Sequence, residues 1–235
     1  MAKLVKFYNG NLIEYDILKL VDFYDPILRQ PTIPFVHQDH APKDCEYLAF
    51  SMVETLKQLG GVGLSANQVG LRHRLCVINM GDEIWTMFNP VIVDHGMTPS
   101  KYSEGCLSYP GLYLKVPRYD HIKVKFQATY GQELEQEFDG LTAVCIQHEI
   151  DHLDGIMYTD RVSSIKLDQA KKKVKKNLKN MRKFQEQQDA FERRQLELEQ
   201  QQEKLQQEQS APAIKILDTP QTTQEKPKAF VYSTG

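Results

Sequence analysis

Long apolar runs are scarce in this 235-residue sequence. The longest uninterrupted ones, such as residues 75–78, are far shorter than the roughly 20 residues that a transmembrane helix needs. The first 20 residues carry Glu14 and Asp16 and lack an apolar stretch before a small-residue cleavage site, unlike a secretory signal or an Arg-rich transit peptide. These absences exclude an integral membrane protein and predict a chain without a targeting segment.

Paired cysteines are missing as well. The four cysteines, Cys45, Cys76, Cys106 and Cys145, are widely spaced and form no CxxC pair. Neither a disulfide-rich scaffold nor a zinc ribbon fits this spacing. We therefore expect a protein of a reducing compartment, and the cytoplasm is its predicted location.

The net charge of −2 hides an uneven distribution of charge and composition. Residues 1–165 carry a net charge of −7 and most of the glycine, cysteine, histidine and aromatic residues, whereas residues 166–235 carry +5 and are rich in Lys, Gln and Glu. We predict a compact domain over 1–165, a basic and then Gln/Glu-rich helical extension over 166–209, and a disordered tail over 210–235.

Two segments of the compact part have helical character. Asp44 is a candidate N-cap, apolar residues of 45–59 recur at three- and four-residue steps, and Gly60 ends the helix. Residues 141–153 are too apolar for a surface helix and end at Gly155. The second helix is therefore predicted to be buried.

Strands are predicted at 74–79 and 84–94, on either side of a Gly-Asp turn. Residues 122–130 alternate apolar and polar side chains, and Gly131 turns the chain into 133–138, which predicts an antiparallel hairpin. Strands followed by a buried helix favour an α+β fold with antiparallel sheets packed around that helix.

The buried helix carries the strongest chemical signal, His148-Glu149-Ile150-Asp151-His152. Histidines four residues apart share one helix face and can hold a single metal ion, and Glu149 is placed to act as a general base. A surface helix with chance histidine spacing is the alternative. The apolar neighbours argue against it, because unpaired polar groups are costly to bury.

Two histidines do not complete a catalytic metal site, which needs a third protein ligand. No histidine follows His152, and Asp160 and Asp168 are weak candidates. Cys106, in a short glycine-containing turn, is the better candidate, since its thiolate could close a Cys-His-His site. A small buried hydrophobe is the alternative interpretation of a lone cysteine.

A third segment, GVGLSANQ at 61–68, follows the first predicted helix. Its glycines allow close backbone approach to a ligand, and Gln68 supplies an uncharged amide donor. The segment lacks the GK[ST] ending of a phosphate loop, so it does not predict nucleotide binding. Taken alone, it is equally typical of a helix stop followed by a turn.

Together, the three segments resemble the peptide deformylase family, whose motifs read GxGLAAxQ, EGCLS and HExDHLxG in this order. This chain has GVGLSANQ at 61–68, EGCLS at 104–108 and HEIDHLDG at 148–155, and the likeness extends over residues 15–162. Ser65 departs from the family, which usually has alanine there. Tyr109 is also unusual after EGCLS.

The resemblance implies removal of the formyl group from the N-terminal formyl-methionine of nascent polypeptides. Cys106, His148 and His152 would hold a divalent metal, Fe²⁺ in the native family, for which Zn²⁺, Ni²⁺ or Co²⁺ can substitute. Glu149 would be the general base. The side chain of Gln68 and the backbone N–H of Leu107 would stabilise the oxyanion.

The substrate would lie beside the metal. By family position, Gly63 would bond the substrate backbone as an added strand. The methionine side chain needs an apolar slot, for which Val62, Leu141, Val144 and Cys145 are candidates because some of them share a helix face with His148. Ordinary core packing explains the same four residues. Arg118 and Asp151 are candidates for an ion pair.

Residues 166–183 form a basic amphipathic helix, with an apolar stripe at Leu167, Ala170, Val174, Leu178 and Met181. Many family members use such a helix to bind the ribosome, and lysines that neutralise phosphates favour this role. A solvated helix packed on the domain by its stripe is an equally weighted alternative. The heptad series beyond it is apolar on one side only, which leaves a weak dimer and a lone extended helix as alternatives, and we expect the lone helix and a monomer.

Two other function classes remain open at this stage. A zinc metallopeptidase could use the same HExxH helix with a third ligand other than Cys106. A ribosome- or RNA-binding protein with a vestigial site is the second alternative, although all the predicted catalytic residues are present.

Overall fold

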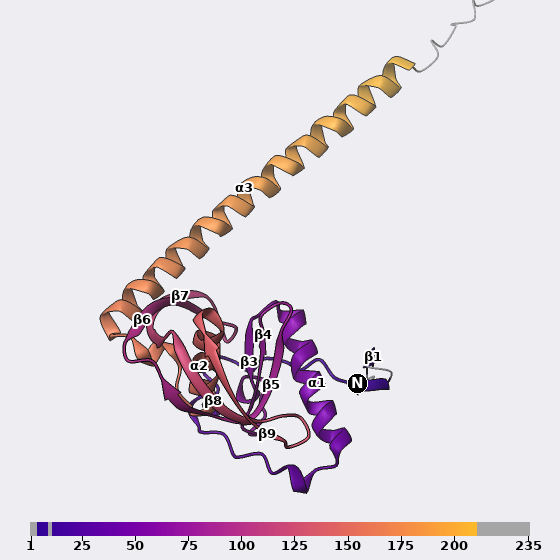
Figure 1. The fold of residues 1–235 in the computed structure, drawn as a ribbon. Coiled ribbons are helices and arrows are strands. Elements are labelled where there is room, and N and C mark those ends of the chain that lie inside the picture. The colour runs from indigo at the N-terminus through magenta and orange to yellow at the C-terminus, as the bar shows by residue number, and fades with distance from the viewer. Residues whose placement is uncertain (1–3, 9–10, 211–235) are drawn as a thin grey trace, which may run out of the picture. The chain divides into compact units, whose positions relative to one another are not determined.

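The computed structural model describes residues 4–8 and 11–210. Apart from residue 210, the segment predicted to be disordered, 210–235, lies outside the described residues. The three α-helices there are α1 (Pro42–Leu59), α2 (Gly140–Leu153) and α3 (Ser164–Ser210) (Figure 1). The strands are β1 (Leu4–Tyr8), β2 (Asn11–Tyr15), β3 (Gly63–Ser65), β4 (Leu75–Asn79), β5 (Ile84–His95), β6 (Pro99–Cys106), β7 (Tyr109–Tyr119), β8 (His121–Gln127) and β9 (Glu133–Asp139).

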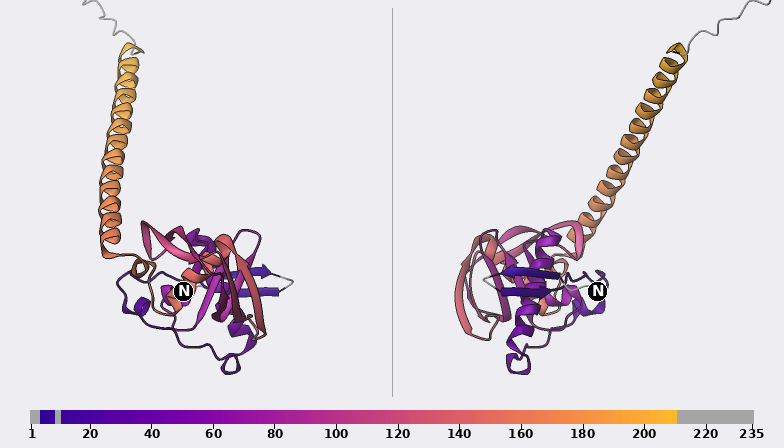
Figure 2. Two further views of the ribbon diagram at one scale, coloured as in Figure 1. Left: turned by 60° about the vertical axis from the view of Figure 1, so that its left-hand side comes forward. Right: turned by 90° about the vertical axis from the view of Figure 1, so that its right-hand side faces the viewer.

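The strands form three antiparallel sheets within the described residues. The largest has the order β3-β4-β5-β8-β9, so β3 and β9 are its outermost strands. The pairs β1-β2 and β6-β7 each form a two-stranded ribbon (Figure 2). Because α2 contacts β3, β4 and β5 as well as β7, it lies among strands of two sheets. The predicted α+β architecture around a buried helix is confirmed.

The predicted hairpin is also confirmed, with β8 slightly shorter than expected. Ile122 lies opposite Phe138, as antiparallel pairing requires. The strand ends at Gln127 because the backbone N–H of Ala128 already donates to Gln132 and closes the turn. Tyr130, predicted to continue the buried alternation, lies in this turn and is more than half exposed.

The start of α1 differs from the prediction. Asp44 is not the N-cap, since the helix begins at Pro42 after Ala41. Proline fits the first helical position because its φ angle is already helical and it has no N–H to leave unpaired. The predicted end is right: Gly60 has a φ of +66°, and its N–H closes the last turn.

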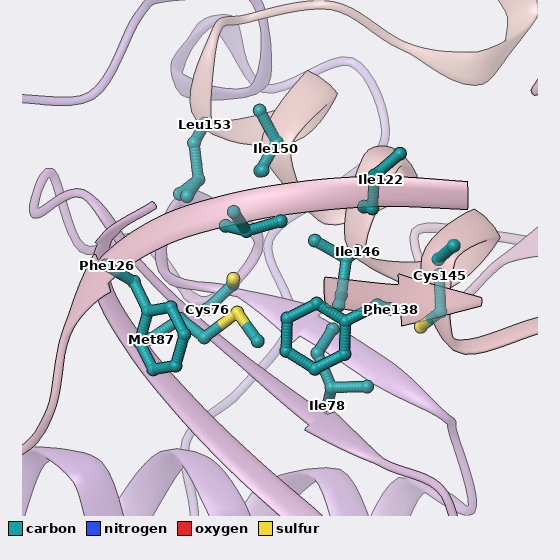
Figure 3. Close-up of a cluster of buried hydrophobic side chains, with 12 residues drawn as sticks. Cys76, Ile78, Met87, Ile122, Phe126, Phe138, Cys145, Ile146, Ile150 and Leu153 are labelled. Atoms are coloured by element: carbon teal, nitrogen blue, oxygen red, sulfur yellow. The ribbon is translucent and has the colours of Figure 1, made fainter. Parts of the chain in front are cut away.

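The main core lies between α2 and the five-stranded sheet. Cys76, Ile78 and Met87 of the sheet pack with Ile146 and Ile150 of the helix, and Figure 3 shows these side chains together. Since α2 is surrounded on so many sides, its polar residues from Gln147 onward are buried. The fold therefore places the two predicted histidine ligands in the interior.

Besides the main core and a second cluster around Met52 and Leu64, a third hydrophobic cluster joins the β6-β7 hairpin to the start of α3. Leu167, Ala170 and Val174 pack against a cluster that contains Leu112 and Tyr158. These three residues belong to the predicted apolar stripe. Leu178, predicted to continue the stripe, is mostly exposed instead.

The chain divides into two compact units, residues 1–179 and 180–235. The described part of the second unit, 180–210, is helical throughout, as predicted. Among the helices that the structure describes, none combines the length and the apolarity needed to cross a membrane.

Candidate metal centre

The two histidines of α2 lie side by side in the interior. Residues 148 and 152 are one helical turn apart, and their ring centroids are 4.8 Å from each other. Both side chains are buried, His152 completely. The predicted pairing on one helix face is therefore present.

Cys106 comes to the same place from the other sheet. It ends β6, and the turn of residues 107–108 leads into β7, so the thiol is presented at the tip of a hairpin. Its Sγ lies 3.2 Å from Nε2 of His152. One potential ligand atom from each of Cys106, His148 and His152 lies within 4.8 Å of the other two.

This geometry suits a metal ion. Ligands of a tetrahedral ion with bonds of about 2.0–2.3 Å lie roughly 3.3–3.8 Å apart, close to the separation of the Cys106 and His152 atoms. The other candidates for the third ligand do not reach the cluster. Asp160 forms an ion pair with Arg29 at 2.6 Å, and Asp168 is exposed on α3.

The charge of the cluster favours a cation as well. Burial lowers the pKa of His148, but hydrogen bonding to Cys106 and Glu104 and the charge of Glu149 outweigh it and raise the pKa to about 10. Burial and the positive charge of His148 lower the pKa of His152 well below its usual value, so that ring is neutral. A metal would displace the proton of His148, and the sulfur of Cys106 with the two imidazoles then forms a set of donors that fits a divalent ion.

Glu104 fixes the orientation of one ligand. Its Oε2 lies 2.8 Å from Nδ1 of His148, which leaves Nε2 for the metal side. Burial raises the pKa of Glu104, but hydrogen bonds from His148 and Arg118 outweigh this effect and lower it. Glu104 is thus an anion that holds the imidazole in one orientation.

Arg118 links this carboxylate to α2. Its guanidinium donates to Glu104 at 2.7 Å and to Asp151 at 2.6 Å, and all three side chains are buried. Arg161 also donates to Asp151, from Nε to the same Oδ2 at 2.9 Å and from Nη2 to Oδ1. The predicted meeting of Arg118 and Asp151 is therefore confirmed, and it extends into a network that joins β6, β7 and α2.

Glu149 points toward β3 and is buried. Its Oε2 accepts a hydrogen bond from the Ser65 hydroxyl at 2.7 Å. A Cβ atom added at Gly63 would overlap Oε1 of Glu149, so only glycine leaves room for the carboxylate. Burial raises the pKa of Glu149 above its usual value. A carboxyl group with a raised pKa is suited to accept and return a proton near neutrality.

Gln68 is oriented by the same loop. Its Oε1 accepts the backbone N–H of Ser65 at 2.8 Å, so its amide nitrogen points the other way. That nitrogen lies 3.1 Å from Oγ of Ser108 and 3.5 Å from Sγ of Cys106. Leu107 directly follows Cys106 in the hairpin turn. Two candidate oxyanion donors therefore belong to segments that adjoin the ligand cluster.

The predicted methionine slot divides into an exposed and a buried pair. Val62 and Leu141 are 58% and 66% exposed, whereas Val144 and Cys145 are buried. Cys145 belongs to the main core, and its thiol donates to the backbone oxygen of Val62 at 3.5 Å. Core packing thus explains Cys145. Val144 is buried but belongs to none of the three core clusters among the described residues.

Three neighbours of the site carried no predicted role. Glu104 lies within the EGCLS segment, and Ser65 and Asn67 lie within the loop 61–68. Asn67 donates from Nδ2 to the backbone oxygen of His152. The sequence indicated their importance only through their positions inside the two motif segments. It could not indicate their hydrogen-bond partners, which are distant in the sequence.

Comparisons with known proteins agree with one another. A family model described as Polypeptide deformylase matches residues 17–168. The curated protein Peptide deformylase 2 from Xanthomonas axonopodis pv. citri is 38% identical over 168 residues, which are 70% of this chain and 98% of that protein. A peptide deformylase from Mesorhizobium japonicum is 40% identical over 169 residues, covering 70% of this chain and 94% of that protein.

Solved structures give the same result. The crystal structure of peptide deformylase from Thermus thermophilus superimposes with a TM-score of 0.61 at 35% sequence identity, covering 70% of this chain and 96% of that one. A peptide deformylase from Synechococcus elongatus in complex with actinonin has a TM-score of 0.61 at 34% identity, covering 66% of this chain and 85% of that one.

Proposed function

The chain belongs to the peptide deformylase family, and on that basis we propose which of its residues carry out the reaction. As a metal-dependent amide hydrolase, the protein removes the formyl group from the N-terminal formyl-methionine of nascent polypeptides and releases formate. The single observation that supports the assignment of roles is the convergence of Cys106, His148 and His152 beside Glu149. This result favours a deformylase over a zinc metallopeptidase or a binding protein with a vestigial site.

The hydrolysis adds water across the C–N bond of the formamide. Glu149 accepts a proton from the attacking water and returns it to the departing amine nitrogen, so the same carboxylate serves both steps. Nε2 of Gln68 and the backbone N–H of Leu107 donate to the negative charge that develops on the formyl oxygen. The C–N bond then breaks, and formate and the free amino terminus result.

The metal that Cys106, His148 and His152 hold is proposed to be Fe²⁺, and Zn²⁺, Ni²⁺ and Co²⁺ can replace it. A divalent ion lowers the pKa of a water and polarises the formyl oxygen. The donor set supports a first-row ion, since thiolate and imidazole suit such metals better than Mg²⁺ or Ca²⁺. The four cysteines are free, which supports the proposed location in the reducing cytoplasm.

The substrate is proposed to lie along β3. This strand pairs with β4 on one side only, with Gly63 opposite Ile78, and it is the outermost strand of its sheet. An extended peptide can add to such an edge, so Gly63 is placed to bond the substrate backbone. Val62 and Leu141 supply exposed apolar surface for the methionine side chain, and the buried Val144 is proposed to complete the slot, together with Cys145, which also packs in the main core.

Replacing Val144 by phenylalanine tests the slot. The larger ring fills space that the methionine side chain needs, so KM for a formyl-Met peptide should rise about tenfold, while bound metal remains unchanged. Steady-state kinetics and metal analysis of the purified variant measure the two effects. An unaltered KM would rule out the assignment of Val144 to the slot.

The direct test of the function is formate release from a formyl-Met tripeptide. The protein should be purified without oxygen and loaded with Fe²⁺, because a thiolate ligand is prone to oxidation. We expect multiple turnovers with this substrate and none with the acetyl-Met tripeptide. A folded, metal-loaded sample that releases no formate would contradict the proposed assignment of the site.

The ribosome is the proposed partner of the basic helix over residues 166–183. The lysines from Lys166 to Lys179 are exposed, while Leu167, Ala170 and Val174 pack against the cluster that contains Leu112 and Tyr158. The helix is thus held by its apolar stripe and presents positive charge outward. An exposed cationic face on an otherwise acidic chain is suited to bind ribosomal RNA.

Neutralising part of this face should weaken ribosome binding. The quadruple substitution of Lys171, Lys172, Lys175 and Lys176 by glutamine is expected to lower the affinity at least tenfold and to reduce its salt dependence. Tripeptide deformylation should stay unchanged, because no apolar contact is altered. Co-sedimentation with ribosomes at several salt concentrations measures the effect, and equal binding by the variant would contradict the proposed contact.

A further inference from the structure

We propose that Ser65 is a positioning residue for the reaction, which holds the Glu149 carboxylate in its working orientation. The proposal rests on the proposed role of Glu149 as the base. Ser65 stands where the family usually has alanine, so its hydroxyl is a departure from the usual residue. The side chain is completely buried, and a hydroxyl in such a place needs hydrogen-bond partners.

The Ser65 hydroxyl has its partners at the site itself. Its Oγ lies 2.7 Å from Oε2 of Glu149 and 2.9 Å from the backbone oxygen of the same residue. The carboxylate oxygen is the nearer and the charged acceptor, so the hydroxyl donates its hydrogen bond mainly to it. Within the described residues, Ser65 is the one side chain with a hydrogen bond to the Glu149 carboxylate.

The opposite oxygen of the carboxylate is confined by backbone. A Cβ at Gly63 would overlap Oε1 of Glu149 and would come within 2.8 Å of Sγ of Cys145. Gly63 and Ser65 are two positions apart on β3 and therefore face the same side. One short strand thus restricts both oxygens, one by contact and the other by a hydrogen bond.

Ser65 also contacts the proposed oxyanion donor, but mainly through its backbone. Its N–H donates to Oε1 of Gln68, and this bond does not depend on the side chain at position 65. The hydroxyl additionally accepts the backbone N–H of Gln68 as a helix cap. Replacing Ser65 by alanine therefore removes the hydrogen bond to Glu149 and this cap, but it leaves the backbone bond that orients the Gln68 amide in place.

The test is the kinetic effect of Ser65→Ala in the metal-loaded enzyme. We expect kcat for the formyl-Met tripeptide to fall about tenfold and KM to change less than twofold, because the base loses its orientation while the substrate site is untouched. Metal content should be unchanged. Ser65→Thr keeps the hydroxyl and is expected to retain most of kcat, provided that its melting temperature shows a folded protein.

Ser51→Ala is the matched control. Ser51 is another buried serine, whose hydroxyl accepts the backbone N–H of Asp16 at 3.0 Å, far along the chain from the site residues. This variant should lower the melting temperature about as much as Ser65→Ala does, without lowering kcat. A similar loss of kcat in both variants would reduce Ser65 to a structural role and overturn the proposal.

Double variants identify the residue through which Ser65 acts. In a Glu149→Ala background, Ser65→Ala should cause no further loss of kcat, whereas in a Gln68→Ala background the full tenfold loss should remain. A full loss in the Glu149→Ala background would overturn the proposal. Substantial activity of Glu149→Ala itself would instead overturn the proposed base, so the two failures are distinguishable.

Discussion

Formate release should fall about 10²- to 10⁴-fold when Glu149 is replaced by alanine, which is the usual contribution of a general base. Glu149 is not among the three ligand atoms that converge at the site, so bound metal should stay at the parental level. KM should also change little, because the substrate is held by the β3 edge and the slot. The measurement combines steady-state kinetics on a formyl-Met tripeptide with metal analysis of the same sample.

Glu135→Ala serves as a control, since this exposed carboxylate of β9 pairs with Lys125 on the surface. It should keep full activity. If Glu149→Ala retained more than about a tenth of kcat while remaining folded and metal-loaded, the proton would have to move through another group. The assignment of the base would then be wrong.

Loss of the metal is the expected result of Cys106→Ser. Serine has nearly the size of cysteine, but its hydroxyl does not supply the soft thiolate that favours a first-row transition metal. Removing a side chain that merely orients a ligand weakens metal binding about 10- to 100-fold, so removing the ligand itself should exceed this loss. Elemental analysis after dialysis, together with titration of Co²⁺ or Ni²⁺ into the metal-free variant, measures the affinity.

A second cysteine provides the comparison. Cys45 is a buried thiol of α1 that packs in the cluster around Met52 and Leu64, outside the ligand group. Cys45→Ser should retain the metal even if its melting temperature falls. Retention of the metal by Cys106→Ser would instead indicate a different third ligand, as the zinc metallopeptidase alternative requires.

The parts of the structure that depend on local periodicity were predictable. The spacing of His148 and His152 and the apolar character of 141–153 are enough to indicate a buried helix with two facing imidazoles. The β8-β9 hairpin followed from alternation and Gly131. The start of α1 differs from the prediction because this helix has no capping side chain and begins at a proline two residues before Asp44.

The rest of the site depends on pairings over long distances in the sequence. Cys106 reaches the histidines only because β6 and β7 pair and then dock on α2, and residue spacing alone left Asp160 and Asp168 open as alternatives. Glu104 was visible as part of a motif, but its contacts with Arg118 and His148 come from residues 14 and 44 positions away. The contact of Ser65 with Glu149 likewise joins residues that are 84 positions apart.

Both the activity and the stability of the enzyme depend on Arg118. The guanidinium pairs with two buried carboxylates, one of which orients His148, so removing it would unpair buried charge and weaken the support of this proposed metal ligand. We therefore expect a substitution of Arg118 to lower both the activity and the stability of the protein. Arg118 has no proposed contact with the substrate, yet it limits which substitutions near the active site the protein can accept.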